Sequence, residues 1–399
     1  MMKMQETLNR KIKFNISIGS LLLLLFLNTS LLLNVRFSSS LIYILFFVIF
    51  ITYFFNNGIT ISRADKCVVL LLFLIFGIDK LNDTLTPFDL KQLIPLLFGL
   101  FWICFLLNNI NRYIIRYLKS YSALSLILLL VWGVVNGIPL NSLDRDSSLL
   151  ILMWIMLVCY SNSSNLFKLF CVFLFMLSEI FIFESRSIIG AFVLFILMRF
   201  LFEKLLRHEK LIITFQRIIL LLFVLYSISF SIYGIVYEYI IYHGYSSEFT
   251  GRGLIWGQAI GCSIDIFDFT VIDWKGLLFG FSTSPEELFK HFSDSIQIAG
   301  DEIEHMEDIL LGGHFHNGFV YIFHNAGLFG LISFVILLFV SIKRLKYNCC
   351  NFCILLPLLF VFLLNGRSLL GIYTSSCLLI IPLLVPFHYS QPDENLYYT

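Results

Sequence analysis

Charged residues are scarce in this chain of 399 residues. Asp, Glu, Lys and Arg make up 13% of it, whereas 59% of the residues are hydrophobic. Soluble domains average about 25% charged and about 45–50% apolar residues. A soluble core could not hide so many long apolar runs, so we predict a polytopic membrane protein with the lipid bilayer as its surroundings. The formal net charge of +1 gives no indication of nucleic-acid binding, and no such partner is predicted.

The motifs of nucleotide-dependent enzymes and zinc proteases are missing as well. The chain has no Walker, Rossmann, Gly-x-Ser-x-Gly or His-Glu-x-x-His pattern. His314, His316 and His324 suggest zinc at first sight, but no Cys, Asp or Glu follows them at helical ligand spacing. An Asp-x-Asp pattern at 144–146 falls in a predicted short external loop, where a solvated charge pair is the simpler interpretation. We therefore predict neither a metal nor a cofactor.

Few cysteines stand at positions where they could form a disulfide or bind a metal ion. Only Cys262 lies in the large polar segment, so that segment can form no internal disulfide. Cys349, Cys350 and Cys353 form a tight group, but no second ligand cluster stands near them in the sequence. We interpret them as ordinary interfacial cysteines.

Apolar runs of about 20 residues, or shorter ones inside a packed bundle, mark the membrane spans. Twelve are predicted, at 15–34, 40–56, 67–78, 92–108, 122–137, 148–161, 166–184, 187–203, 211–236, 316–341, 351–364 and 368–387. Open sheet edges cannot face lipid, so the spans are helices. The predicted fold is an all-α membrane bundle forming a single domain over 1–399.

The distribution of Lys and Arg sets the orientation of the spans. With the amino terminus inside, the cytoplasmic segments carry fifteen of these residues and the external loops nine. The segment 237–315 then lies outside, with thirteen acidic residues against three basic ones. Loops of this length usually carry function. We expect short amphipathic helices within it at Glu286–Phe292 and Asp301–Leu311.

Three predicted external turns hold an arginine beside small residues, at Arg186, Arg252 and Arg367. An arginine at a membrane boundary costs free energy unless it reaches water or meets an anion. Each can be a lone topological or head-group arginine, or part of a clamp that binds diphosphate oxygens through its guanidinium. Glycines on both sides of Arg252 favour the clamp, because they let the backbone approach a ligand closely.

His316 and Asn317 stand where the polar segment ends and an apolar run begins. A neutral imidazole can take a proton from a sugar hydroxyl, so His316 is the candidate base. His324 is expected two turns into the following helix, facing protein. Glu179 lies within a predicted span, seven residues before Arg186 and so on about the same helix face. It is either functional or a buried partner of Arg186 or of another helix.

The pair His316-Asn317, separated by nine residues from Gly327-x-x-Gly330, resembles the signature of the bacterial O-antigen ligase and O-antigen polymerase superfamily. The context is similar too: a large external loop precedes the motif, an apolar helix follows it, and two further spans complete the chain. The resemblance covers about residues 180–385.

Three further stretches resemble the same family. Arg252 with Trp256 four residues later is similar to the family's arginine early in the loop. Residues 274–280 resemble its Pro-Leu-x-Gly-x-Gly turn, although the proline and one glycine are missing. Ser185 and Arg186 resemble a Ser-Arg pair that opens a helix before the loop.

This resemblance implies an inverting, metal-independent membrane glycosyltransferase of the GT-C type in the bacterial inner membrane, with its active site facing the periplasm. Its donor would be an undecaprenyl-diphosphate-linked oligosaccharide, its acceptor a glycan or lipid A-core, and a chain-length regulator is a further candidate partner. The catalytic candidates are His316, Arg252 and Arg186. The substrate-binding candidates are Asn317, Trp256, His314 and Arg367.

The signature does not separate polymerase from ligase. A polymerase adds the glycan to another lipid-linked unit, whereas a ligase transfers it to the lipid A-core. The acidic loop would repel a phosphorylated core, which favours a polymerase over a ligase. A transporter or flippase is the alternative of another class. It would place charged residues in the middle of several spans, where only Glu179 clearly qualifies.

Overall fold

The computed structural model describes part of the chain, and the account below concerns only those residues. They are 48, 66–72, 74–75, 144–161, 163–182, 185–205, 209–242, 252–261, 272–280, 317–344 and 349–365. This part is helical and contains no strand, in agreement with the predicted all-α class. Five predicted spans lie outside it, Val48 excepted: 15–34, 40–56, 92–108, 122–137 and 368–387.

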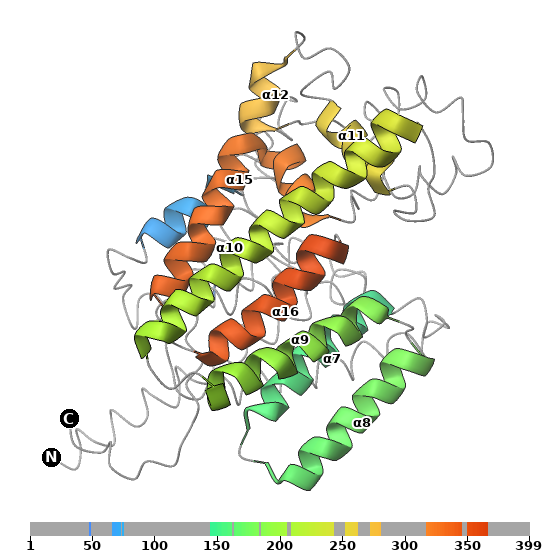
Figure 1. Ribbon diagram of the computed structural model, residues 1–399, viewed down its shortest axis with the longest axis vertical. Helices are drawn as coiled ribbons and strands as arrows, with labels where there is room; N and C mark the ends of the chain where they lie inside the picture. Colours follow the sequence, from blue (N-terminus) through green and yellow to red (C-terminus); the bar gives the residue numbers. More distant parts are fainter. Residues whose placement is uncertain are drawn as a thin grey trace, which may run out of the picture.

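The described helices are drawn as ribbons in Figure 1. They are α7 (Asp144–Cys159), α8 (Asn165–Phe181), α9 (Arg186–Phe200), α10 (Glu209–Gly234), α11 (Arg252–Gly261), α12 (Trp274–Phe279), α15 (Gly318–Arg344) and α16 (Cys349–Asn365). Two π-helical segments extend α9 and α10, namely η2 (Leu201–Leu205) and η3 (Ile235–Tyr242). Six predicted spans, from 148–161 to 351–364, each fall on one of the long helices.

Helix α7 begins earlier than the sequence suggested. Its first residue is Asp144, so the Asp-x-Asp pattern at 144–146 forms the first helical turn and not a loop. Residues 66–72 and 74–75 are helical too, within the predicted span 67–78.

Helix α8 shows how local sequence sets the limits and the buried face of an element. The Ser164 hydroxyl caps its start by accepting the N–H of Phe167 at 3.3 Å. Its buried residues Cys171, Phe175 and Glu179 recur every four positions, which is one helix face. That face packs on α7 and α9, and the Phe175 ring lies 4.8 Å from the Phe192 ring.

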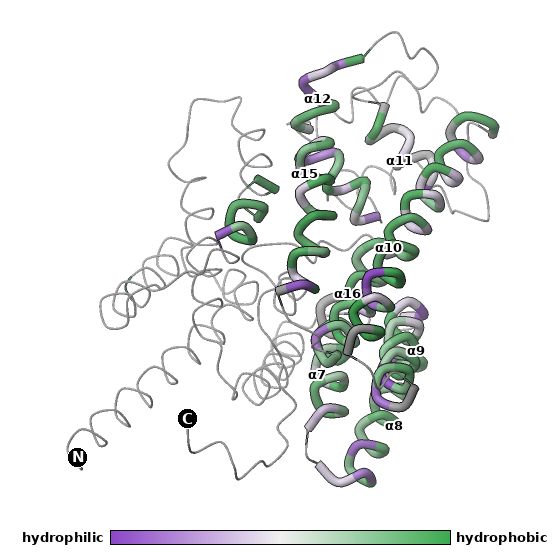
Figure 2. The backbone as a smooth tube through the Cα atoms, turned by 60° about the vertical axis from the view of Figure 1, so that its left-hand side comes forward, coloured by the Kyte–Doolittle hydropathy of each residue, from purple (hydrophilic) through white to green (hydrophobic). Residues whose placement is uncertain are grey.

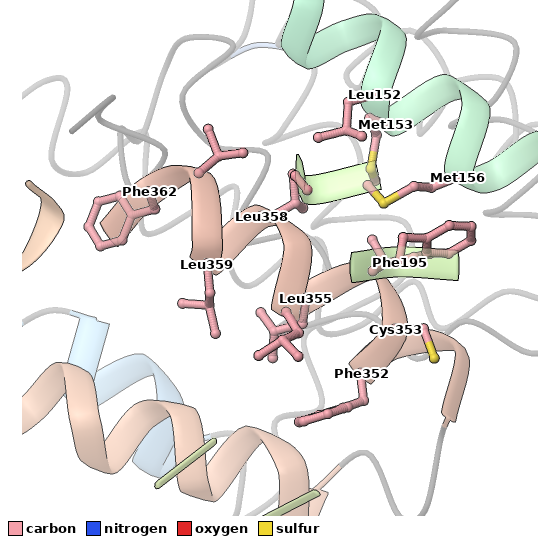
Figure 3. Packing of buried hydrophobic residues seen from close by; sticks show 14 of the residues in the cluster. Leu152, Met153, Met156, Phe195, Phe352, Cys353, Leu355, Leu358, Leu359 and Phe362 are labelled. Atoms are coloured by element: carbon pink, nitrogen blue, oxygen red, sulfur yellow. The ribbon is translucent and has the colours of Figure 1, made fainter. Parts of the chain in front are cut away.

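Helix α16 is the centre of the described bundle. It packs against α9, α10 and α15, and in Figure 1 it runs between α9 and α10. Apart from two asparagines its side chains are apolar, and almost all of them are buried, as expected of a helix enclosed by other helices. Figure 3 shows Leu355 and Leu358 among side chains of α7 and α9, including Met156 and Phe195.

Among the described helices, two are long and apolar enough to cross a membrane. They cover Leu211–Glu238, which is α10 with half of η3, and Gly318–Lys343 in α15. Apolar side chains stay exposed on their outer faces, such as Leu222 on α10 and Ile332 on α15. Figure 2 shows the hydrophobic colouring running along these helices. The described part is thus compatible with a membrane protein.

Candidate active site at the Asn317 end of the bundle

The last turns of α16 connect several helices at one end of the bundle, which we call the Asn317 end. A methyl group added at Gly190, in the second turn of α9, would lie 3.6 Å from the Phe360 ring of α16. One added at Gly318, the first residue of α15, would lie 2.5 Å from the Phe362 ring. The last turns of α16 therefore lie beside the start of α9 and beside the start of α15.

Asn317 joins α15 to α10, the fourth helix at this end. Its Oδ1 accepts the N–H groups of Phe319 at 3.0 Å and Val320 at 3.2 Å, which makes it the N-cap of α15. Its Nδ2 donates to the Ser231 hydroxyl at 2.6 Å, and that hydroxyl donates to the Ser227 carbonyl at 2.8 Å. Only 1% of Asn317 is exposed. The cap fixes the main chain that immediately follows His316.

Arg252 is the first residue of α11, and its main chain is held against the end of α10. The next residue, Gly253, donates its N–H to the Glu238 carboxylate at 2.6 Å. A methyl group on Gly253 would lie 2.7 Å from the carbonyl carbon of Gly234 and 2.9 Å from Oε2 of Glu238. Glycine is required here by this close approach. Arg252 itself is half-buried.

One turn further along the chain, α11 packs between α10 and α15. The Trp256 side chain is 1% exposed, and its ring lies 5.8 Å from the ring of Phe230 on α10. On the other side, His324 Nδ1 donates to the Ala259 carbonyl at 3.2 Å. His324 is 3% exposed, so it faces protein as predicted. Trp256 lies in this packing, and its predicted contact with substrate stays a prediction.

Arg186 lies at the same end on a different helix. It is the first residue of α9 and is exposed. Glu179 is fully buried on α8, which ends at Phe181. The seven-residue spacing from Glu179 to Arg186 therefore crosses a turn, and the prediction that both share one helix face was wrong.

The predicted residues thus divide into two groups. The structure brings Arg252, Trp256 and Asn317 onto mutually packed elements, since α11 contacts α10, η3 and α15. Arg186 lies apart from this group on α9, whose main contacts are with α7, α8 and α16. His314, His316 and Arg367 lie outside the described residues, as do the short helices expected at Glu286–Phe292 and Asp301–Leu311.

The two glycine motifs of the sequence meet each other. Gly327 has φ 63° and ψ −162°, and this residue kinks α15. Gly280, just after α12, has φ 84°. A methyl group on Gly327 would lie 2.5 Å from the carbonyl oxygen of Leu278 and from the nitrogen of Phe279. A methyl group on Gly280 would lie 2.6 Å from the nitrogen of Ala326. Backbone packs directly on backbone, and α12 is fixed against the kink.

The opposite end of the bundle, the Cys349 end, has different chemistry. Arg199 pairs with Glu203 at 2.9 Å, donates to the Cys159 carbonyl at 2.8 Å and lies 4.9 Å from the centre of the Tyr160 ring. These side chains line a pocket of about 360 Å³ with Phe202, Cys349, Cys350 and Cys353. Among the residues that the structure describes, no group of three His, Cys, Asp or Glu could hold a metal ion.

Sequence reasoning missed two residues of the Asn317 end. Glu238 was counted among the acids of an external loop, yet it is fully buried in η3. Ser231, which receives the Asn317 amide, looked like any small polar residue of a span. The available signal was position: Glu238 ends an apolar run fourteen residues before Arg252.

No protein-family model, curated protein or solved structure gives a significant match to this chain.

Proposed function

We propose that this chain is a glycosyltransferase of the bacterial inner membrane, acting as an O-antigen polymerase. It would transfer glycan from undecaprenyl diphosphate onto another lipid-linked repeat unit at the periplasmic face. The full bundle would have about twelve transmembrane helices, with 237–315 as its large periplasmic loop. The observation that carries the proposal is the packing of α11, which begins at Arg252, against both α10 and α15, the helix that Asn317 caps.

Charge is the first part of the argument. Lipid diphosphate is the leaving group, so negative charge grows on it as the glycosidic bond breaks. Cationic groups held in place beforehand stabilise such charge, and guanidinium groups do so with paired hydrogen bonds. Arg252 and Arg186 have this role in the proposal. Arg367 is a further candidate for the same diphosphate.

The acceptor hydroxyl needs a base, and this is the proposed role of His316. Asn317 supports it indirectly, because its side chain caps α15 and bonds Ser231. That capped start fixes the main chain next to the base, and a fixed base reacts faster than a mobile one. His314 and Trp256 are the proposed contacts to the sugar.

A membrane location is supported by the outer surface of the helices. Leu166, Phe170, Phe173 and Phe181 of α8 are each more than half exposed, which water would penalise and lipid would not. The long helices alternate in direction, so the starts of α9 and α15 lie beside the last turns of α16 (Figure 1). Alternation of this kind lets loops far apart in sequence build one site on one membrane face.

The test is complementation of a deletion strain, followed by gel analysis of its lipopolysaccharide. His316→Ala and Arg252→Ala should each reduce long glycan at least a hundredfold, on the order expected for loss of a base or of an oxyanion donor. Arg217→Ala is the control, because Arg217 is an exposed arginine of α10 far from its Asn317 end. Wild-type glycan in both site variants, at normal membrane levels, would refute the proposal.

The deletion strain itself decides between related activities. A core carrying one repeat unit identifies a polymerase, and a bare core identifies a ligase. Bare core together with lipid-linked repeat units that stay on the cytoplasmic face identifies a flippase.

A further inference from the structure

A buried carboxylate at the Asn317 end has no part in the chemistry described so far. Glu238 lies in η3, at the outer end of α10, and is fully buried. Burying a carboxylate is costly unless hydrogen bonds compensate it. A carboxylate at such a position is therefore expected to contribute through its charge or its acceptor oxygens.

Glu238 contacts the main chain beside the candidate catalytic arginine. Oε2 accepts the Gly253 N–H at 2.6 Å, a short distance typical of a charge-assisted hydrogen bond. Gly253 directly follows Arg252, and the two residues open α11. The carboxylate therefore determines where the backbone of Arg252 lies.

The shape of the surroundings makes this contact specific. The Gly253 backbone lies so close to Gly234 and Glu238 that a methyl group would lie within 3 Å of both. The π-helical geometry of η3 begins at Ile235, immediately after Gly234, and the wider turn carries Glu238. One turn into α11, the contact of Trp256 with Phe230 supplies a second attachment to α10.

We infer that Glu238 is a positioning residue, which holds Arg252 toward the lipid diphosphate by fixing the Gly253 amide. The inference rests on the proposed function, because it assigns a supporting part to the same site. Glu238 touches no substrate in this scheme and acts only through the backbone of α11. Its effect should therefore depend on the presence of the Arg252 guanidinium.

The test measures binding of undecaprenyl diphosphate to the full chain in detergent. Glu238→Ala should weaken binding about tenfold or more, on the scale of a lost hydrogen bond to a charged group. Glu238→Gln should stay within about threefold of the wild type, because its amide oxygen still accepts an N–H. Glu203→Gln, a change at the Cys349 end, is the matched control and should bind normally.

Two further measurements separate positioning from general stability. In an Arg252→Ala background, Glu238→Ala should add no further loss, whereas independent effects would multiply. Hydrogen exchange should rise in 252–261 for Glu238→Ala and stay unchanged in α16. Multiplying effects, unchanged exchange in α11, or failure of Gln to rescue would each overturn the inference.

The same data report separately on the proposed function. Normal binding by Arg252→Ala counts against a diphosphate role for this arginine, whatever Glu238 does. Weak binding by Arg252→Ala beside normal binding by Glu238→Ala overturns the positioning role alone.

Discussion

Replacing Gly327 by alanine tests the joint between α15 and α12. The residue has φ 63° and ψ −162°, a region that is essentially restricted to glycine. Forcing alanine into it costs about 1–3 kcal/mol. The added methyl would also lie 2.5 Å from Leu278 and Phe279 backbone atoms, well inside the usual carbon contact of about 3.5–4 Å.

Relieving that overlap requires the two backbones to separate by about 1 Å, since the usual contact distance is about 3.5 Å or more. Overpacking of this kind typically costs about 1–3 kcal/mol. The two effects together predict a loss of about 2–6 kcal/mol, a large part of the stability of an ordinary protein. The Phe279 and Phe329 rings, now 5.2 Å apart, would separate as well.

The assay measures thermal stability in detergent. The chain is fused to a fluorescent protein, extracted in mild detergent and heated, and the fraction that remains monodisperse is measured by size-exclusion chromatography. Gly190→Ala is the matched control. Its methyl would lie 3.6 Å from Phe360, an ordinary contact, and alanine stabilises a helix interior by about 0.5–1 kcal/mol relative to glycine. We expect Gly327→Ala to lower the midpoint and Gly190→Ala to leave or raise it. Equal midpoints for both variants would refute the structural reasoning.

Two further predictions concern the start of α15. Asn317→Ala removes the cap and should lower the stability of the folded chain by about 0.5–2 kcal/mol in the same assay. Asn317→Asp keeps the acceptor oxygen and should lower the stability less. Equal losses of stability in the two variants would mean that the cap contributes nothing. Gly318→Ala places a methyl 2.5 Å from the Phe362 ring and should cost about 1–3 kcal/mol, with partial recovery in the double variant with Phe362→Leu. Absence of that recovery would show that the ring is not the obstacle.

The long helices could be predicted from the sequence because their apolar runs report burial in lipid or protein directly. Each long run between 148 and 364 corresponds to a helix, with limits that differ by a few residues. The helices α11 and α12 were not predicted. They lie in a polar segment where short helices form only through tertiary packing, and neither hydropathy nor charge counts record that packing.

The candidate site was predicted in part. Residues with unusual chemistry in an apolar chain, such as Arg252 and Arg186, stand out by themselves. The residues that hold them in place do not stand out. They are ordinary residues whose role depends on contacts with residues far away in the sequence. The Asn317 amide meets Ser231 across 86 positions, and His324 meets Ala259 across 65. The kink at Gly327 was likewise hidden, since a glycine in a sequence does not reveal its φ.

The joint between Gly280 and Gly327 has a consequence for the order of biosynthesis. Helix α12 has six residues, too few to be stable alone, and its docking surface in α15 is made some forty residues later. Helix α12 can therefore dock only after α15 has been synthesised, whereas α11 can already pack against α10 and η3. A chain interrupted before residue 330 would keep the support of Arg252 by Glu238 and lose the docking of α12.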